Sequence, residues 1–159
     1  MTQAALFEVE TGAWRRTTKF DPRAAALADR HYSRRTVGSP QFMPPGRTLV
    51  LVTEAGDAVW GTHWPDPALT LDGLDAWRCS IFRNEGPHLS SDLIVEAMQR
   101  TAETWRERPQ DGWLTFVRID KVRSVNPGAC FKAAGWWLDR SWTHPKLVRL
   151  RAALMLEER

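Results

Sequence analysis

Residues suited to binding an anion occur at a junction between a predicted strand and a predicted long helix. This junction, Phe82–His88, reads Phe-Arg-Asn-Glu-Gly-Pro-His in the 159-residue chain. Backbone N–H groups at such a junction point outward, and the dipole of the following helix favours an anion there. The residues predicted to hold such an anion are Arg83, Asn84, Gly86 and Ser90. The alternative is a tight turn whose polar residues only cap the helix.

A second set of polar residues could act on an acceptor molecule. Asp120 follows a predicted strand, and sheet proteins usually bind ligands at the carboxyl ends of strands. Its carboxylate could accept a proton from an amine or hold a metal, or it could cap a turn beside Lys121. His31 and Tyr32 could line a nucleobase pocket, or could lie at a solvent-exposed helix end. Ser91 lies in the first turn of the predicted long helix.

The composition bounds the class of protein. At 159 residues, with 43% hydrophobic and 26% charged residues, the chain is expected to form one globular domain over residues 1–159. No apolar run could span a membrane and no signal peptide is visible, which predicts a cytoplasmic protein without membrane association. The four histidines are widely spaced, and Cys79 and Cys130 have no near partner, so no metal site is predicted. A net charge of +3 permits a polyanionic partner without requiring one.

Hydrophobic periodicity and turn residues predict the elements that would position these groups. The predicted strands are residues 47–53, 58–64, 76–82, 113–119, 136–142 and 147–154. The predicted helices are residues 22–34, a long helix that is capped at its N-terminus by Ser90 or Ser91 and ends before Pro109, and residues 127–134. Their order predicts an α/β (α+β mixed) fold with a central mixed sheet of about six strands flanked by helices.

Two segments resemble the GCN5-related N-acetyltransferase (GNAT) superfamily. Ala129–Trp136 is similar to its Ala-Leu-Tyr-x-x-x-Gly-Phe segment, and Arg83-x-x-Gly86-x-His88 resembles its Arg/Gln-x-x-Gly-x-Gly/Ala pyrophosphate loop. The resemblance implies a GNAT-like fold from about residue 20, with acetyl-CoA or another acyl donor bound at the loop. Two positions depart from the pattern. His88 replaces a small residue, and Phe131 replaces a tyrosine that often serves as general acid, so it has no proton to give.

A narrower resemblance is to the Mom type of phage DNA-modification protein. It rests on Trp77–Gly86, on Leu89-Ser90-Ser91 and on four further matches: His31-Tyr32, Ser91, Asp120 and Gly128–Phe131. The resemblance implies modification of adenine bases in DNA by an acyl-type group, which protects phage DNA from restriction. The catalytic residues that it implies are His31, Tyr32, Ser91 and Asp120.

The leading hypothesis is an enzyme that transfers an acyl-type group to a nucleobase amine in DNA. A base in duplex DNA would have to leave the stack to react, and the more basic second half of the chain would contact the backbone. Two alternatives stay open. One is an acetyl-CoA-dependent N-acetyltransferase acting on a small amine or a protein, and the other is a non-catalytic GNAT-like module that binds DNA or protein.

Overall fold

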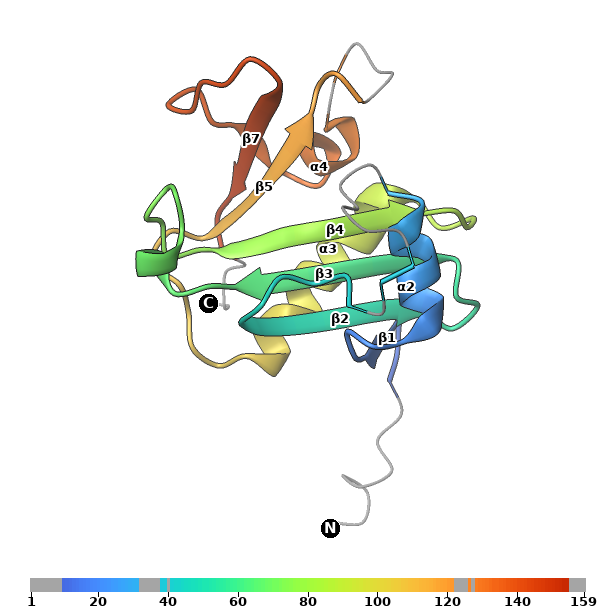
Figure 1. Ribbon diagram of the computed structural model, residues 1–159. Coiled ribbons are helices and arrows are strands. Elements are labelled where there is room, and N and C mark those ends of the chain that lie inside the picture. The colour runs from blue at the N-terminus through green and yellow to red at the C-terminus, as the bar shows by residue number, and fades with distance from the viewer. Residues whose placement is uncertain (1–9, 32–37, 40, 122–125, 127, 155–159) are drawn as a thin grey trace.

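In the computed structural model, one mixed sheet runs through the molecule and carries helices on both faces (Figure 1). The structure describes residues 10–31, 38–39, 41–121, 126 and 128–154. The seven strands of the sheet follow the order β1-β2-β3-β4-β5-β7-β6. The long helix α3 lies behind the sheet in Figure 1, and α2 lies in front of β2, β3 and β4. β4 and β5 are parallel, whereas every other neighbouring pair is antiparallel.

The bounds of the elements are as follows. The strands are β1 (Trp14–Thr17), β2 (Arg47–Thr53), β3 (Ala58–Trp64), β4 (Trp77–Asn84), β5 (Trp113–Arg118), β6 (Trp137–Leu138) and β7 (Leu147–Ala152). The helices are α2 (Pro22–Asp29), the 3-10 helix η1 (Pro67–Leu69), α3 (Ser90–Thr104) and α4 (Ala129–Ala133).

The observed sheet confirms the predicted fold class, while three elements differ from the prediction. β1 was not predicted, and it adds a seventh strand at the edge of the sheet. Helix α2 ends at Asp29 rather than near Arg34, because the Arg30 N–H turns back to the Leu27 carbonyl in a tight final turn. β6 stops after two residues, because the chain turns at Asp139, whose carbonyl accepts the Trp142 N–H.

Aromatic side chains fill the core between the sheet and α3. Trp60, Trp77 and Trp113 are completely buried, and their rings meet edge to face, with centroids 5.3 Å apart for Trp77–Trp113 and 6.0 Å for Trp60–Trp113. The helix contributes Leu93, Ile94, Ala97 and Met98 to the same core. Most of the tryptophans thus have a structural role in the core, although Trp137 is half exposed.

The backbone ladder between β4 and β5 is confined to the beginning of the two strands. Their ladder consists of the pairs Trp77–Trp113 and Arg78–Leu114, after which the strands separate. In Figure 1, the ribbons of β5 and β7 diverge from that of β4; we call these two diverging parts of the sheet the arms and the region between them the opening. The sheet therefore places the ends of β4 and β5 on either side of one opening.

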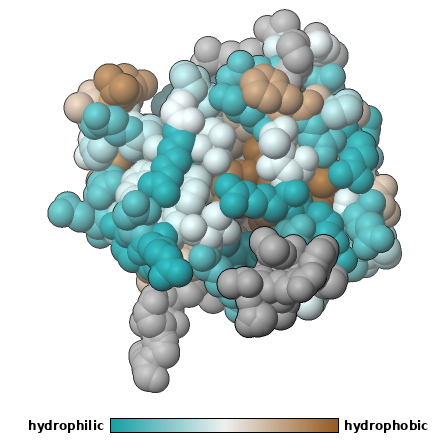
Figure 2. Space-filling model, turned by 90° about the horizontal axis from the view of Figure 1, so that it is seen from below, coloured by the Kyte–Doolittle hydropathy of each residue, from teal (hydrophilic) through white to brown (hydrophobic). Residues whose placement is uncertain are grey.

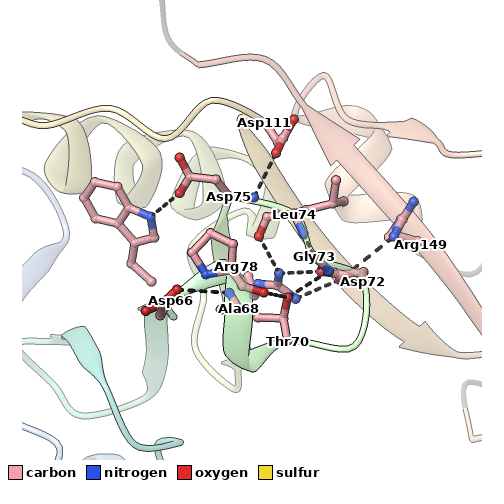
Figure 3. Close-up of polar contacts among 12 residues, drawn as sticks. Asp66, Ala68, Thr70, Asp72, Gly73, Leu74, Asp75, Arg78, Asp111 and Arg149 are labelled. Atoms are coloured by element: carbon pink, nitrogen blue, oxygen red, sulfur yellow. Dashed lines mark hydrogen bonds and ion pairs between the residues drawn. The ribbon is translucent and has the colours of Figure 1, made fainter.

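A network of buried charged side chains lies on one face of the sheet, beside the ladder where this opening begins (Figure 3). The β3–β4 connection carries Asp72, which accepts two hydrogen bonds from the Arg78 guanidinium of β4, at 2.8 and 2.9 Å. Arg149 of β7 lies 3.9 Å from Asp72 and 2.8 Å from Asp139. The network thus ties both arms of the opening to the connection between β3 and β4.

Replacing Asp72 tests how far the network stabilises the fold. We expect Asp72→Asn to lower the free energy of unfolding by about 3–5 kcal/mol, because it leaves the buried guanidinium of Arg78 without its counter-charge. Urea denaturation followed by tryptophan fluorescence measures the change. The matched control is Glu54→Gln, whose carboxylate is 82% exposed and bound to Arg15; its effect should stay below about 1 kcal/mol. Equal effects of the two variants would contradict a structural role for the network.

The same network predicts a loss of stability in acid. Burial alone would raise the pKa of Asp72, but hydrogen bonds from Arg78 outweigh it and lower the pKa to about 2. Burial is also outweighed at Asp139, where Ser141 and Arg149 lower the pKa to about 2. Carboxylates with a lowered folded-state pKa stabilise the fold above the unfolded-state pKa of about 3.9. We therefore expect stability to fall between about pH 4 and pH 2, and to fall less in Asp72→Asn, when denaturation is compared at both ends of this range.

Candidate functional site

The opening between β4 and β5 contains a small cavity. Its volume is about 70 Å³, enough for a group of only a few atoms. It is lined by His31 from beyond the end of α2, by Ser80 and Phe82 from β4, by Phe116 from β5 and by Phe131 from α4. The cavity therefore combines an aromatic wall with a small number of polar groups, as small-molecule sites commonly do.

A β-bulge in β4 brings Ser80 to this cavity. Gly61 of β3 pairs with Ile81 and Thr62 pairs with Cys79, so Ser80 is the extra residue on β4. Its hydroxyl donates to the Met43 sulfur at 3.3 Å. Bulges interrupt the ladder and re-aim side chains, and they are common beside active sites.

His31 is the predicted site residue that the structure places at the cavity. It is half-buried rather than at a solvent-exposed helix end, and its N–H bonds to the Ala28 carbonyl at 2.9 Å. Burial, assisted by the positive charge of Arg83, lowers the pKa of His31 to about 4. The imidazole is therefore uncharged at neutral pH, and one ring nitrogen can accept a proton.

The two cysteines near the cavity are poor nucleophiles. Cys79 lines the cavity and Cys130 packs against the adjoining core. Burial raises the pKa of both thiols. Because the thiolate is the reactive form, neither side chain is suited to covalent catalysis at neutral pH.

The N-terminus of α3 leaves backbone donors open beside the end of β4. The capping position is Leu89, whose side chain accepts no hydrogen bond, so the expectation that Ser90 or Ser91 caps the helix is wrong. Among the described hydrogen bonds, none uses the amide N–H groups of residues 88–92 as donors. The helix dipole adds partial positive charge at the same place, which favours an anion.

The turn before α3 is already closed by its own side chains. Asn84 Nδ2 donates to the His88 carbonyl at 2.7 Å and to Ser90 Oγ at 3.0 Å, while Asn84 Oδ1 accepts the Gly86 N–H at 3.0 Å. A Cβ at Gly86 would collide with the Asp57 carboxylate. Asn84 and Gly86 thus shape the turn, and the open donors lie one step further along the chain.

Arg83 is engaged in an ion-pair cluster. Its Nε donates to Glu85 at 2.6 Å, and the same carboxylate accepts from Arg30 Nε at 2.7 Å. These two arginines lower the pKa of Glu85 to about 2. A phosphate that binds to Arg83 would therefore have to share the guanidinium with the Glu85 carboxylate or displace that carboxylate.

Asp120 lies at the tip of the other arm, just beyond β5. Both of its oxygens accept from the Arg118 guanidinium, at 2.8 and 2.6 Å. This hydrogen bonding lowers the pKa of Asp120. The carboxylate is exposed and ionised, and its described contacts are with Arg118 rather than with His31.

The structure therefore groups the predicted residues in three places. His31 is at the cavity; Arg83, Asn84, Gly86, Ser90 and Ser91 are around the start of α3; and Asp120 is at the end of β5. Tyr32 lies outside the described residues. Three residues of the site, Ser80, Phe116 and Asp57, were not predicted from the sequence. Ser80 reaches the cavity through the bulge in β4, Phe116 lines it where β5 separates from β4, and Asp57 lies against Gly86. Among these three, only Asp57 carries a sequence signal, as the second residue of a Gly-Asp turn.

Two features are absent from the described part of the chain. No group of three or more histidine, cysteine, aspartate or glutamate side chains gathers there as a metal site would require. Within the same residues, no helix has the length and hydrophobicity needed to cross a bilayer.

Comparison with known proteins identifies the class of fold. No protein-family model matches the chain, and neither does any curated protein. Among solved structures, the chain is similar to the GNAT domain of S. lividans PAT, with a TM-score of 0.53 and 17% sequence identity over 86% of this chain and 87% of that chain. The fold is therefore GNAT-like.

Titration of His31 tests the electrostatics of the cavity. We expect its imidazole to stay neutral down to about pH 4 in NMR titrations, with the signal assigned by its loss in His31→Gln. Arg83→Ala should raise the pKa of His31, because it removes a nearby positive charge. Arg23→Ala, which removes an arginine bound to Asp21 at the start of α2, is the control and should leave that pKa unchanged. A His31 that titrates near 6.5 would rule out burial in the cavity.

Proposed function

We propose that this protein transfers an acyl-type group from a donor with an anionic end, such as acetyl-CoA, to a nucleobase amine in DNA. The reaction centre would be the cavity between β4 and β5. The GNAT-like fold supports acyl transfer. The observation that carries the choice of acceptor is the uncharged, half-buried His31 at that cavity.

The open end of α3 fits the anionic end of such a donor. The amide N–H groups of residues 88–92 have no acceptor in the described structure, and the helix dipole reinforces them. Ser90 and Ser91 lie in the same turn and can add hydroxyl donors. The Asn84 side chain and the Asp57 carboxylate fill the preceding turn, so an anion would bind to the helix end rather than deep in that turn.

A donor of this kind supplies an activated acyl carbonyl, and the chain supplies the surroundings in which it reacts. Phe82, Phe116 and Phe131 wall the cavity, so water is restricted there and only a small group fits. Phe131 carries no proton, so it cannot act as the general acid. As the amine nitrogen bonds to the acyl carbon and the bond between that carbon and the donor's leaving group breaks, His31 at the cavity would take the proton that the amine loses and return it to the leaving group, which is a thiol in the case of acetyl-CoA.

The pKa of His31 favours one kind of acceptor. An aliphatic amine such as lysine has a pKa of about 10.4 and must lose a proton before it can attack. A base with a pKa of about 4 removes that proton poorly. The exocyclic amine of a nucleobase is uncharged at neutral pH and becomes strongly acidic only as it forms the new bond, when a weak base suffices. The positive charge of Arg83 beside His31 also disfavours a cationic ammonium there and favours a polyanion.

The remaining predicted residues take supporting roles in this proposal. Asp120 is held ionised by Arg118, so it suits hydrogen bonding to the acceptor better than proton removal. Tyr32, which lies outside the described residues, remains a proposed partner of His31 through its place in the sequence. The modification of adenine and protection against restriction, which the Mom-type resemblance implies, belong to the same proposal.

The proposal is tested by mass spectrometry of nucleosides from DNA of cells that express the protein. We expect a new nucleoside with the intact protein, and at least about a hundredfold less of it with His31→Gln, in the range by which general acid–base catalysis contributes. The control is His63→Gln, in which the replaced imidazole bonds to the Pro45 carbonyl outside the cavity.

Two other results would overturn the choice of acceptor. Purified protein that binds coenzyme A and acetylates amines or proteins while leaving DNA unchanged would be an ordinary N-acetyltransferase. Protein that binds DNA without altering any nucleoside, even when supplied with acyl donors, would be a non-catalytic module.

A further inference from the structure

A basic surface with exposed aromatic character lies at the tip of the β5–β7 arm. We call it the aromatic–basic rim, and it consists of Lys121, Trp142, His144 and Lys146. The Ile119 N–H donates to the Lys146 carbonyl at 2.9 Å, and the Lys121 N–H donates to the Arg118 carbonyl at 3.2 Å. The end of β5 and the start of β7 thus hold the two lysines on one tip.

The aromatic part of the rim is a stack of two parallel rings. The centroids of Trp142 and His144 lie 6.2 Å apart, with planes inclined by 8°. The Lys146 N–H donates to His144 Nδ1 at 3.0 Å, which fixes the orientation of the imidazole. Arg149 lies 5.0 Å from the Trp142 ring and supports it from β7. His144 is exposed, so one end of an ordered stack faces solvent.

The stack leads back to the cavity. Trp142 packs on Phe116 with ring centroids 5.1 Å apart, and Phe116 lines the cavity between β4 and β5. A row of three rings, Phe116, Trp142 and His144, therefore runs from the cavity to the surface. A molecule bound on the rim would lie beside the opening that leads to His31.

The two lysines of the rim carry positive charges that are exposed to solvent. Lys121 and Lys146 are both exposed, and no described contact pairs either side chain with a carboxylate at ion-pair distance. Hydrogen bonds from Arg118 and the nearby charge of Lys146 both lower the pKa of Asp120, so this carboxylate neighbours Lys146 while its two oxygens accept from Arg118. Asp139, on the connection that carries Trp142, is buried against Arg149. A phosphate that binds to Lys121 or Lys146 would therefore break no ion pair of these lysines among the described contacts.

We propose that the aromatic–basic rim binds DNA next to the reaction centre, with phosphates on Lys121 and Lys146 and an unstacked base against His144. This inference rests on the proposed function, because it names the surface that would present the acceptor. Lysines positioned around an exposed ring are the combination by which proteins bind single-stranded nucleic acid, since every base has a face that can stack. An acidic peptide would use the lysines but would gain nothing from the ring.

Fluorescence anisotropy with a fluorescein-labelled oligothymidylate, measured over a range of salt concentrations, tests the rim. We expect Lys121→Ala/Lys146→Ala to weaken binding and to reduce the slope of log affinity against log salt by about 1.4, since each phosphate contact on a single strand contributes about 0.7. His144→Ala should weaken binding by roughly fivefold or more while leaving that slope unchanged, because stacking is not ionic. The matched control is Arg16→Ala/Lys19→Ala, which removes the same charge near the β1 edge.

The outcomes separate the rim from the proposed function. Equal losses in the rim and control pairs, or binding of a polyglutamate peptide as tight as that of the oligonucleotide, would overturn the rim as a DNA site. A new nucleoside formed by the rim variants at the wild-type rate would also overturn it while leaving the proposed function intact. Loss of binding confined to the rim variants, with no nucleoside change in wild type, would support the rim and overturn the reaction.

The control surface is distinct from the rim in the fold. Arg16 and Lys19 line a separate hollow of about 280 Å³ beside Thr48 and Leu49, at the β1 edge of the sheet. Seen from below, this edge is mostly hydrophilic, with hydrophobic atoms showing between the polar residues (Figure 2). The control pair thus removes two positive charges from the edge furthest from β5 in the strand order.

Discussion

The molecule depends on the short ladder between β4 and β5. Only two residue pairs form the ladder between these strands. The candidate site residues that the two strands carry lie beyond the point where the strands separate. Tryptophans pack against this ladder from the α3 side, and the ion pairs of Asp72, Arg78 and Arg149 lie on the other face of the sheet. A buried charge network contributes less net stability than its Coulomb energy suggests, but it penalises any arrangement in which the charges lose their partners. The network therefore favours one geometry of the opening.

Burial sets the protonation states of the side chains that line that opening. The same burial that holds Cys79 and Cys130 as thiols keeps His31 uncharged, whereas the exposed Asp120 stays ionised beside Arg118. The cavity thus offers a neutral acceptor of protons and no anionic nucleophile. This selection of protonation states follows from where the strands part, because the separation decides which side chains face solvent and which face aromatic rings.

Local signals in the sequence were enough to predict the elements and their order but not their ends. Asp21 caps α2 as its place before Pro22 predicts, and Gly135 follows α4 in a left-handed conformation. Ser90 looked like a cap, but its hydroxyl accepts from Asn84, a contact that no helix pattern encodes. His31 was predicted as a site residue from its type and a resemblance, while its burial depends on strands more than 40 residues away. Ser80 and Phe116 become site residues only through the bulge and the separation of the strands, which are properties of the whole sheet.

In the proposed reaction, the two arms of the opening would give two anionic molecules separate places to bind. The arm of β4 ends at the open amides of α3, where positive charge comes from the backbone and is fixed in position. The arm of β5 and β7 ends in lysine side chains around a ring stack, where charge is mobile and suits a flexible polyanion. A compact phosphate-bearing donor and a nucleic acid would otherwise compete for the same cations. Because the arms diverge from one root, each could hold its own anion while the reacting groups meet at the cavity between them.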